Sequence, residues 1–464
     1  MLFFLPALLL CIPGILAWKD QCGSFAPAIA NVHLLNATYY EANVFVNLSS
    51  PLQTITTSSL PAFCRLQLNI TTNPATGKAA YSEVWLPDGW NSRTLGFGNG
   101  GWSGGGHNGI SRDGSFGGPR NDDAIIDFAY RALHLTTVAA KTLASQYYGY
   151  NHTKSYYMAC STGGRQGIKA MSSFPEDYDG VVIGSPANAM ARLQPWTIHQ
   201  SLNVQPVNSS RWIPAALWPV IHKEALRQCD SLDGVTDGII SNPEVCDFRP
   251  ELITCRKGSN TTTIWMATNW IFSGYVPGGE LGYPTGLATA EPYQISTDYY
   301  KYFVLNDTTW DYHTLNASTN TPDLTAFFAR GGKVIQYVGW NDQLISPGNS
   351  IKWYKDVYAY TLANSAINPD EHFKLFTVPG MRHCFTGEGA WIFGAASQRS
   401  TAPPPENNST YDIQVAMVEW LETNRTVDHI VATKYRNDSA LSGVSFTRKL
   451  CPVRDDEDLQ RFGC

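Results

Sequence analysis

Cys160 stands directly before Ser161, and Cys384 stands directly after His383. A disulfide between these cysteines would tether the serine to the histidine, although the two come from distant parts of the chain. Asp342 lies between them in chain order, so a nucleophile, its base and an acid that orients the base are all present. The fold has to bring these segments to one place. The pattern favours a secreted serine esterase.

Short runs rich in Val, Ile, Tyr and Trp recur along the chain, with helical periods between several of them. The runs predict strands that begin at Ala79, Arg93, Leu135, Lys154, Tyr178, Gly331 and His372. Helices are predicted from Asp122, Thr142 and Ile413. Strands that alternate with helices predict an α/β fold with a mostly parallel, doubly wound sheet.

Ser161 follows the apolar run that begins at Lys154 and precedes a helical stretch. This order of strand, turn and helix is typical of a nucleophile elbow, although Ala159 replaces the first glycine of the usual G-x-S-x-G pattern. Gly163 and Gly164 allow the close packing that a sharp turn requires. The helix N-terminus would direct positive charge toward Ser161. Taken alone, the segment also suits an ordinary turn.

Two further strand ends carry the other polar groups. The run GKVIQYVGW ends in Asn341 and Asp342, and the run HFKLFTVPG leads into the segment that contains His383. Asp342 would hold the histidine in the tautomer that accepts the serine proton. A single Asp or His at a strand end is more often a polar turn residue, but the chain order Ser, Asp, His is typical of the α/β-hydrolase fold. The order predicts a catalytic triad of Ser161, Asp342 and His383.

A glycine-rich loop follows the strand predicted at Arg93. An ester hydrolase needs N–H donors for the tetrahedral oxyanion, and glycine-rich backbone can approach a substrate closely. We predict an oxyanion hole that consists of the Thr162 amide and an amide of Gly100 or Gly101. The glycines also suit a plain flexible loop.

The sequence from about residue 188 to residue 325 is rich in Trp, Pro, Gly and Asn and lacks a regular strand pattern. Strand patterns resume at Gly331. We therefore predict a lid domain at 188–325, inserted into a discontinuous α/β-hydrolase catalytic domain of residues 18–187 and 326–464.

An acidic loop with two glycines lies inside the predicted lid. Calcium prefers oxygen ligands such as carboxylates and backbone carbonyls. The candidate ligands are the carboxylates of Asp230, Asp233 and Asp237 and the carbonyls of Val235 and Ile239. A Cys229–Cys246 bridge would close the loop. The spacing differs from that of an EF-hand, and a solvated acidic turn is the alternative.

The chain begins with an apolar run, MLFFLPALLLCIPGILA, that ends in a small residue and predicts a secretory signal peptide over residues 1–17. The run is short for a membrane span, so no anchor is expected. Of 10 cysteines, nine remain once Cys11 leaves with the signal, which suits four bridges and one thiol in an oxidising compartment. Export is also favoured by Asn-x-Ser/Thr sequons at Asn36, Asn47, Asn69, Asn151, Asn208, Asn260, Asn306, Asn316, Asn407, Asn408, Asn424 and Asn437.

The charge distribution narrows the class of partner. The formal net charge of -6 and the lack of a Lys or Arg cluster argue against binding to nucleic acid or to an anionic membrane. The 43% hydrophobic and 16% charged residues describe a globular chain. Small or uncharged polymeric substrates are the favoured partners.

Taken together, these motifs resemble the tannase and feruloyl esterase family of secreted fungal-type esterases. The resemblance covers nearly the whole mature chain. It rests on FCR at Phe63, EVWLP before an Asp-Gly-Trp-Asn loop, GNGGW, SYYMACSTGGRQG, FPEDYDGVV, CDSLDGVTDGII, WND and RHC. The paired CS and HC motifs are unusual and specific.

The resemblance implies an α/β-hydrolase fold with a lid, in which Ser161 is the nucleophile, Asp342 orients the base and His383 is the base. It also implies a calcium ion in the lid, bound by Asp230, Asp233, Val235, Asp237 and Ile239. The implied disulfides are Cys160–Cys384, Cys22–Cys64, Cys229–Cys246 and Cys451–Cys464. Cys255 is left without its family partner, because TTTIWMATNW stands where that partner is expected, so the lid is expected to be shortened.

The implied activity is hydrolysis of phenolic-acid esters. Feruloyl and other hydroxycinnamoyl esters of plant cell-wall polysaccharide are favoured over galloyl esters of tannins. A noncatalytic binding protein on a hydrolase fold is the alternative of another class. A glycosidase is disfavoured because no Asp or Glu pair has a comparable context, whereas a serine peptidase would share the triad. A homodimer is compatible with the sequence.

Overall fold

The computed structural model describes residues 13–49, 54–101, 122–190, 193, 217–253 and 321–453. The chain divides into two compact units. The first combines the described residues up to Thr94 with Leu135–Thr153. The second holds the described residues of 95–134 and those from Lys154 onward.

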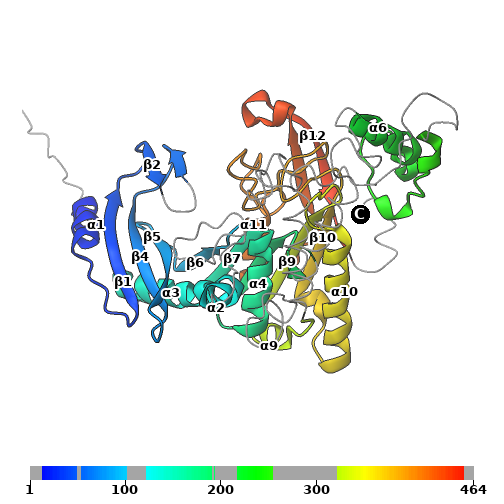
Figure 1. The fold of residues 1–464 in the computed structure, drawn as a ribbon. Coiled ribbons are helices and arrows are strands. Elements are labelled where there is room, and N and C mark those ends of the chain that lie inside the picture. Colours follow the sequence, from blue (N-terminus) through cyan, green and yellow to red (C-terminus); the bar gives the residue numbers. More distant parts are fainter. Residues whose placement is uncertain are drawn as a thin grey trace, which may run out of the picture. The chain divides into compact units, whose positions relative to one another are not determined.

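The first unit is built on an antiparallel sheet with strand order β1-β4-β5 (Figure 1). Its strands are β1 (Val32–Tyr40), β4 (Phe63–Asn73) and β5 (Lys78–Pro87), and a separate pair consists of β2 (Val46–Ser49) and β3 (Thr54–Thr57). Leu66, Leu68 and Ile70 alternate along β4 and are buried in one core with residues of helix α3 (Ala132–Tyr148). The Cys22–Cys64 disulfide joins helix α1 (Pro13–Ser24) to β4. The residues predicted as the start of the catalytic domain thus have a sheet and core of their own.

The strand predicted from Leu135 is wrong, because these residues lie inside helix α3. Thr and Val in this stretch favour strands in isolation. However, Ala139, Leu143 and Tyr147 recur at helical spacing and are buried together. Burial of this helical face outweighs the local strand preference.

The second unit contains a six-stranded sheet with order β13-β10-β9-β8-β7-β6. Its strands are β6 (Arg93–Phe97), β7 (Lys154–Cys160), β8 (Gly180–Gly184), β9 (Lys333–Gly339), β10 (Phe373–Val378) and β13 (Pro452–Val453). The pairs β7–β8, β8–β9 and β9–β10 are parallel, and β13 runs antiparallel to β10. The prediction of a mostly parallel sheet is confirmed.

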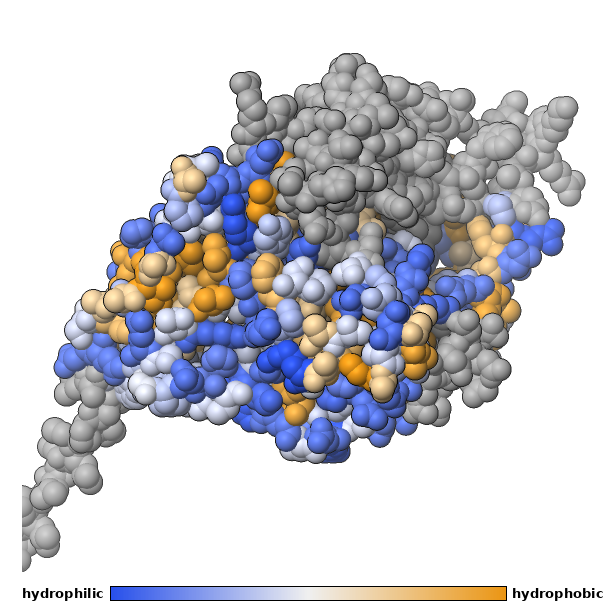
Figure 2. Space-filling view, turned by 90° about the horizontal axis from the view of Figure 1, so that it is seen from below, coloured by the Kyte–Doolittle hydropathy of each residue, from blue (hydrophilic) through white to orange (hydrophobic). Residues whose placement is uncertain are grey.

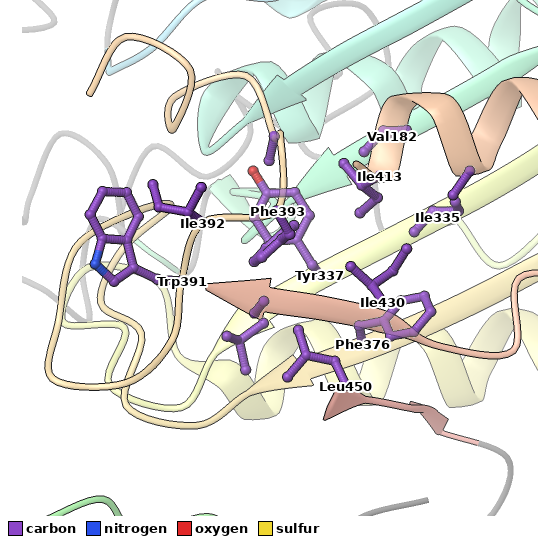
Figure 3. Close-up of a cluster of buried hydrophobic side chains, with 14 of the residues drawn as sticks. Val182, Ile335, Tyr337, Phe376, Trp391, Ile392, Phe393, Ile413, Ile430 and Leu450 are labelled. Carbon is purple, nitrogen blue, oxygen red and sulfur yellow. The ribbon is translucent and has the colours of Figure 1, made fainter. Parts of the chain in front are cut away.

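Alternate residues of these strands enter two different cores. Tyr157 and Ala159 pack in the core that contains α4 (Thr162–Ser173), α9 (Thr325–Ala329) and α10 (Pro347–Asn364). Tyr156 and Met158 belong to the opposite core, with α11 (Ile413–Thr423) and the hairpin of β11 (Ile430–Tyr435) and β12 (Val444–Leu450). Figure 3 shows Tyr337 of this second core beside residues of α11 and β11. The sheet is therefore covered on both faces, as a doubly wound fold requires.

The remaining elements are short or lie in the predicted insertion. They are α2 (Asp122–Ile126), a π-helix η2 (Asp127–Arg131), α6 (Trp218–Cys229) and the 3-10 helices η4 (Asp230–Asp233), η5 (Pro243–Val245), η6 (Pro250–Ile253), η10 (Pro369–Glu371), η11 (Arg436–Asp438) and η12 (Ala440–Ser442). Much of the predicted lid at 188–325 lies outside the described residues, so its boundaries stay a prediction. Helix α1 includes residues on both sides of the predicted end of the signal peptide.

The surface in Figure 2 carries mostly hydrophilic residues, with separate apolar patches between them. The exposed large apolar side chains include Phe45, Phe97 and Leu441. Among the described helices, none combines the length and the apolar character needed to cross a membrane.

Candidate active site

Ser161 occupies the sharp turn between β7 and α4. Its backbone has φ 65° and ψ -126°, a conformation that residues other than glycine rarely adopt. Hydrogen bonds hold the turn on both sides, since the Ser161 N–H donates to the Gly184 carbonyl and the Ser161 carbonyl accepts from the Ala187 N–H. The predicted elbow is therefore present as a strained strand-to-helix turn.

Two glycines allow this turn to pack closely. A Cβ on Gly163 would lie 2.5 Å from the Cβ of Ala159 and 2.8 Å from the carbonyl oxygen of Asn99. A Cβ on Gly164 would lie 2.7 Å from the carbonyl oxygen of Gly184. Neither position has room for a side chain, which explains the glycine pair after the serine.

Asp342 and His383 meet beyond the ends of β9 and β10. The His383 Nδ1 lies 2.9 Å from each carboxylate oxygen of Asp342. The Asp342 side chain is fully buried, and its Oδ1 accepts the backbone N–H groups of Leu344 and Ile345 at 2.9 and 2.8 Å. A buried carboxylate held in this way favours the tautomer with the proton on Nδ1. The Nε2 atom is then the nitrogen that can accept a proton.

A disulfide connects the serine turn to the histidine loop. Cys160 and Cys384 are bonded, with their Cα atoms 6.0 Å apart. Ser161 and His383 are the adjacent residues, so the bond limits how far the two can separate. The strands β7, β9 and β10 are parallel members of one sheet, and their carboxyl ends therefore open at the same edge. The structure thus pairs Asp342 with His383 and links the His383 loop to the Ser161 turn through the disulfide, while the catalytic roles of the three residues stay a prediction.

Two glutamines support the histidine loop, and sequence reasoning missed both. The His383 N–H donates to the side-chain oxygen of Gln343 at 3.1 Å. Gln398 is fully buried and donates to the Cys384 carbonyl at 3.4 Å. Its side-chain oxygen also accepts the N–H groups of Phe393 and Ala395. No sequence pattern distinguishes these glutamines from surface residues.

A buried tyrosine, Tyr337, lies near Asp342, the acid of the predicted triad. Burial and, to a smaller extent, the charge of Asp342 raise the pKa of Tyr337. Its phenol therefore remains neutral at neutral pH. A neutral tyrosine places no second negative charge beside the carboxylate.

The loop proposed for the oxyanion hole lies against α4. The hydroxyl of Thr162 donates to the Gly101 carbonyl at 2.5 Å, and the Asn99 N–H donates to the side chain of Gln166 at 2.9 Å. Gly100 and Gly101 lie between these attachment points. The loop thus lies beside the residue that follows Ser161, where an ester hydrolase needs it.

The other predicted cysteine pairs are Cys22–Cys64 and Cys229–Cys246, and both are disulfides in the structure. Cys451 is also disulfide-bonded. Its predicted partner Cys464 lies outside the described residues, so that pairing stays a prediction. Cys255 lies outside them as well.

The acidic loop after α6 is held by its own backbone. The Asp230 carboxylate accepts the N–H groups of Asp237, Gly238 and Ile239. Asp233 accepts the N–H of Val235, and Asp237 forms an ion pair with Arg448 at 2.7 Å. In the described part of the chain, no three His, Cys, Asp or Glu side chains are grouped as ligands of one metal ion. The donor atoms that the loop offers are all oxygens, which fits calcium chemistry.

Comparison with known proteins agrees with this geometry. A family model described as "Tannase and feruloyl esterase" matches residues 102–275 and 266–455. A protein of Aspergillus terreus named "Probable feruloyl esterase B-2" is 32% identical in a gapped alignment 492 residues long. The match covers 94% of this chain and 91% of the relative.

Two solved structures share the fold. The crystal structure of feruloyl esterase B from Aspergillus oryzae matches with a TM-score of 0.77 and 29% identity, and the match covers 94% of this chain and 95% of that one. Tannin acyl hydrolase from Aspergillus niger matches with a TM-score of 0.67 and 20% identity over 94% of this chain and 91% of that one. The fold is therefore that of the α/β hydrolases. The chain belongs to the tannase and feruloyl esterase family of carboxylic ester hydrolases.

Proposed function

We propose that this protein is a secreted serine esterase that hydrolyses phenolic-acid esters, with feruloyl and related hydroxycinnamoyl esters of plant cell-wall polysaccharide as its substrates. The observation that carries the proposal is the pairing of His383 with buried Asp342, together with the disulfide that ties their loop to Ser161. The similarity to relatives named feruloyl esterase B, 32% identical over 94% of this chain, supports the choice of a feruloyl-type acyl group.

The proposed chemistry has two steps. The Nε2 of His383 takes the proton of the Ser161 hydroxyl, and the serine oxygen forms a bond to the ester carbonyl carbon. The tetrahedral intermediate collapses, the bond to the alcohol oxygen breaks, and the imidazolium returns the proton to the leaving alcohol. Water then attacks the acyl-enzyme with the same base and releases the phenolic acid.

Asp342 stabilises the imidazolium that forms in both steps. The oxygen of each tetrahedral intermediate would accept hydrogen bonds from the Thr162 amide and from an amide of Gly100 or Gly101. One such donor is worth about 3 kcal/mol in the transition state. The hydrogen bonds of this loop to α4 support the assignment.

We also propose a structural calcium ion in the acidic loop. The ligands would be the carboxylates of Asp230, Asp233 and Asp237 and the carbonyls of Val235 and Ile239. The loop offers oxygen donors of the kind that calcium prefers, and the Cys229–Cys246 disulfide that closes the loop supports a fixed site. The ion would have no part in the ester chemistry.

Export is proposed from the apolar run at residues 1–17 and from the disulfides, since such bonds persist in oxidising compartments. The protein released by its host should begin at Trp18, which N-terminal sequencing will establish. A mature chain that retains residues 1–17 would contradict the signal peptide. The homodimer stays a prediction that light scattering can test.

The decisive experiment combines a substrate panel with Ser161→Ala. The panel consists of methyl ferulate, caffeate, sinapate, p-coumarate and gallate. The variant should lose hydrolysis of every ester and labelling by a serine-directed phosphonate, whereas Ser173→Ala at the exposed end of α4 should retain both.

Retained hydrolysis in Ser161→Ala would exclude this nucleophile. A wild-type protein that neither hydrolyses an ester nor reacts with the phosphonate would be a noncatalytic binding protein. Preference for methyl gallate over the hydroxycinnamates would identify a tannin acyl hydrolase instead.

A further inference from the structure

Helix α4 holds the glycine-rich loop Gly98–Gly101 at two points. The backbone N–H of Asn99 donates to Oε1 of Gln166 at 2.9 Å. The hydroxyl of Thr162 donates to the Gly101 carbonyl at 2.5 Å. Thr162 and Gln166 are one helical turn apart, so they project from the same side of α4. One face of a single helix thus fixes both ends of the loop.

Burial makes these attachments costly to release. Gln166 is 2% exposed and Thr162 is 3% exposed. A buried polar group that loses its partner costs about 1–3 kcal/mol. Close packing also restricts the loop. Gly98 lies so near the helix that a Cβ on it would be 2.7 Å from the Cα of Gly163. The loop therefore has one favoured position against the helix.

The attachments also limit which amides can reach a substrate. The Asn99 N–H is engaged by Gln166 and is not available as an oxyanion donor. The amides of Gly100 and Gly101 remain between the two attachment points. Thr162 contributes its own amide directly after Ser161, and its hydroxyl anchors Gly101. The two halves of the predicted oxyanion hole are thereby linked through one residue.

We propose that Gln166 and the Thr162 hydroxyl are positioning groups that set the geometry of the oxyanion hole. The proposal rests on the ester hydrolysis proposed above. Neither group needs to touch the substrate, because each acts through the loop backbone. Their loss should weaken binding of the tetrahedral intermediate and leave binding of the ester nearly unchanged.

The test replaces Gln166 by Met, which has a similar length and no hydrogen-bond acceptor of comparable strength. The kcat for methyl ferulate should fall about 10- to 100-fold, less than the 10²–10³-fold typical of complete removal of a donor. The KM should stay within about threefold, as expected for an interaction made only in the transition state. The inhibition constant of an arylboronic acid, which forms a tetrahedral adduct with the serine, should rise in parallel with the loss in kcat.

Gln336→Met is the matched control. Gln336 is equally buried, but it lies in β9 and donates to the Ser350 carbonyl instead of the loop. This variant should retain the wild-type kcat. Thr162→Val removes the second attachment and should resemble Gln166→Met, whereas Thr162→Ser keeps the hydroxyl and should lose less activity.

The outcomes separate the two proposals. Wild-type activity that survives Ser161→Ala would overturn the proposed function. With that function intact, any one of three results would overturn the positioning role. Gln166→Met would keep kcat within about twofold of the wild type, or its kcat would fall while the inhibition constant of the boronic acid stays unchanged. The third result is a loss of kcat in Gln336→Met as large as that in Gln166→Met. Should Gln166→Met fail to fold, the comparison of Thr162→Val with Thr162→Ser decides: equal losses would refute the role of the hydroxyl.

Discussion

At the scale of single residues, the site depends on a few atoms that are held rigidly. Ser161 is strained at positive φ, and backbone hydrogen bonds to Gly184 and Ala187 stabilise its turn. Asp342 is fixed by two amides before it contacts His383. Backbone groups therefore position the Ser161 turn and the Asp342 carboxylate, and the Asp342 and Gln343 side chains position His383.

Replacement of Asp342 by Asn tests the role of the acid. The amide keeps the size of the side chain but can donate to Nδ1, which would favour the wrong histidine tautomer. The kcat for methyl ferulate should fall by about 10⁴-fold. Phosphonate labelling of Ser161 should slow in proportion. A loss smaller than about tenfold would show that Asp342 does not orient the base.

At the scale of elements, the Cys160–Cys384 bond connects the end of β7 to the loop after β10, with β8 and β9 between them in the sheet. The bond spans 224 residues of sequence. A crosslink over a long segment restricts the unfolded chain strongly. The same bond restricts the separation of Ser161 and His383, so we expect it to contribute both to stability and to catalysis.

The double variant Cys160→Ala, Cys384→Ala should lose about 2–4 kcal/mol of unfolding free energy and most of its esterase activity. Denaturant unfolding and initial rates measure the two effects. The double variant of Cys229 and Cys246, whose bond spans 17 residues, is the matched control and should keep its activity. Unchanged stability and unchanged rates in the first variant would disprove the tether.

The antiparallel sheet of the first unit contains a buried ion pair between β4 and β5. Arg65 donates two hydrogen bonds to Glu83 at 2.9 and 2.6 Å, and Tyr81 and Trp85 donate to the same carboxylate. Burial by itself would raise the pKa of Glu83, but the hydrogen bonds from Arg65, Tyr81 and Trp85 outweigh it and lower the pKa. The ionised form is therefore favoured by folding.

This lowered pKa predicts a pH-dependent effect of Glu83→Gln. The stabilisation is fully present above the unfolded pKa of about 4.3 and is lost as the pH falls through the lower folded pKa. At pH 7 the variant should lose about 1.5–3 kcal/mol of unfolding free energy, and the deficit should shrink in acid. Glu419→Gln, which breaks a largely exposed pair with Arg425, should change stability little. A deficit that is constant across pH would contradict the ionic role.

At the scale of the whole molecule, two units of different construction share one chain. The first unit packs an antiparallel sheet against α3, whereas the second covers a mostly parallel sheet on both faces. Predicted triad residues all belong to the second unit. The acidic loop belongs to that unit as well, and Asp237 connects it to β12 through Arg448.

Calcium binding to this loop should stabilise the folded protein by mass action, by about 2.7 kcal/mol at a calcium concentration 100 times the Kd. Protein treated with a chelator should melt at a lower temperature, and added calcium should restore the melting temperature, unlike added magnesium at the same concentration. Asp233→Asn should reduce this shift, whereas Asp356→Asn in α10 should preserve it. Absence of calcium from protein purified without chelator, with no shift on its addition, would reject the site.

Sequence patterns alone predict the α/β alternation, the chain order of Ser161, Asp342 and His383, and the family. Such features are local: residue periodicity marks a strand or helix, and the motifs at strand ends are short. Tertiary packing overrides the local strand pattern at Leu135, because burial of Ala139, Leu143 and Tyr147 on one face selects the helix. The contacts of Gln166 and Gln398 likewise exist only in the folded chain. Glutamine has no positional signature in sequence, and its hydrogen bonds to Asn99 and Cys384 exist only once segments distant in the chain are packed together.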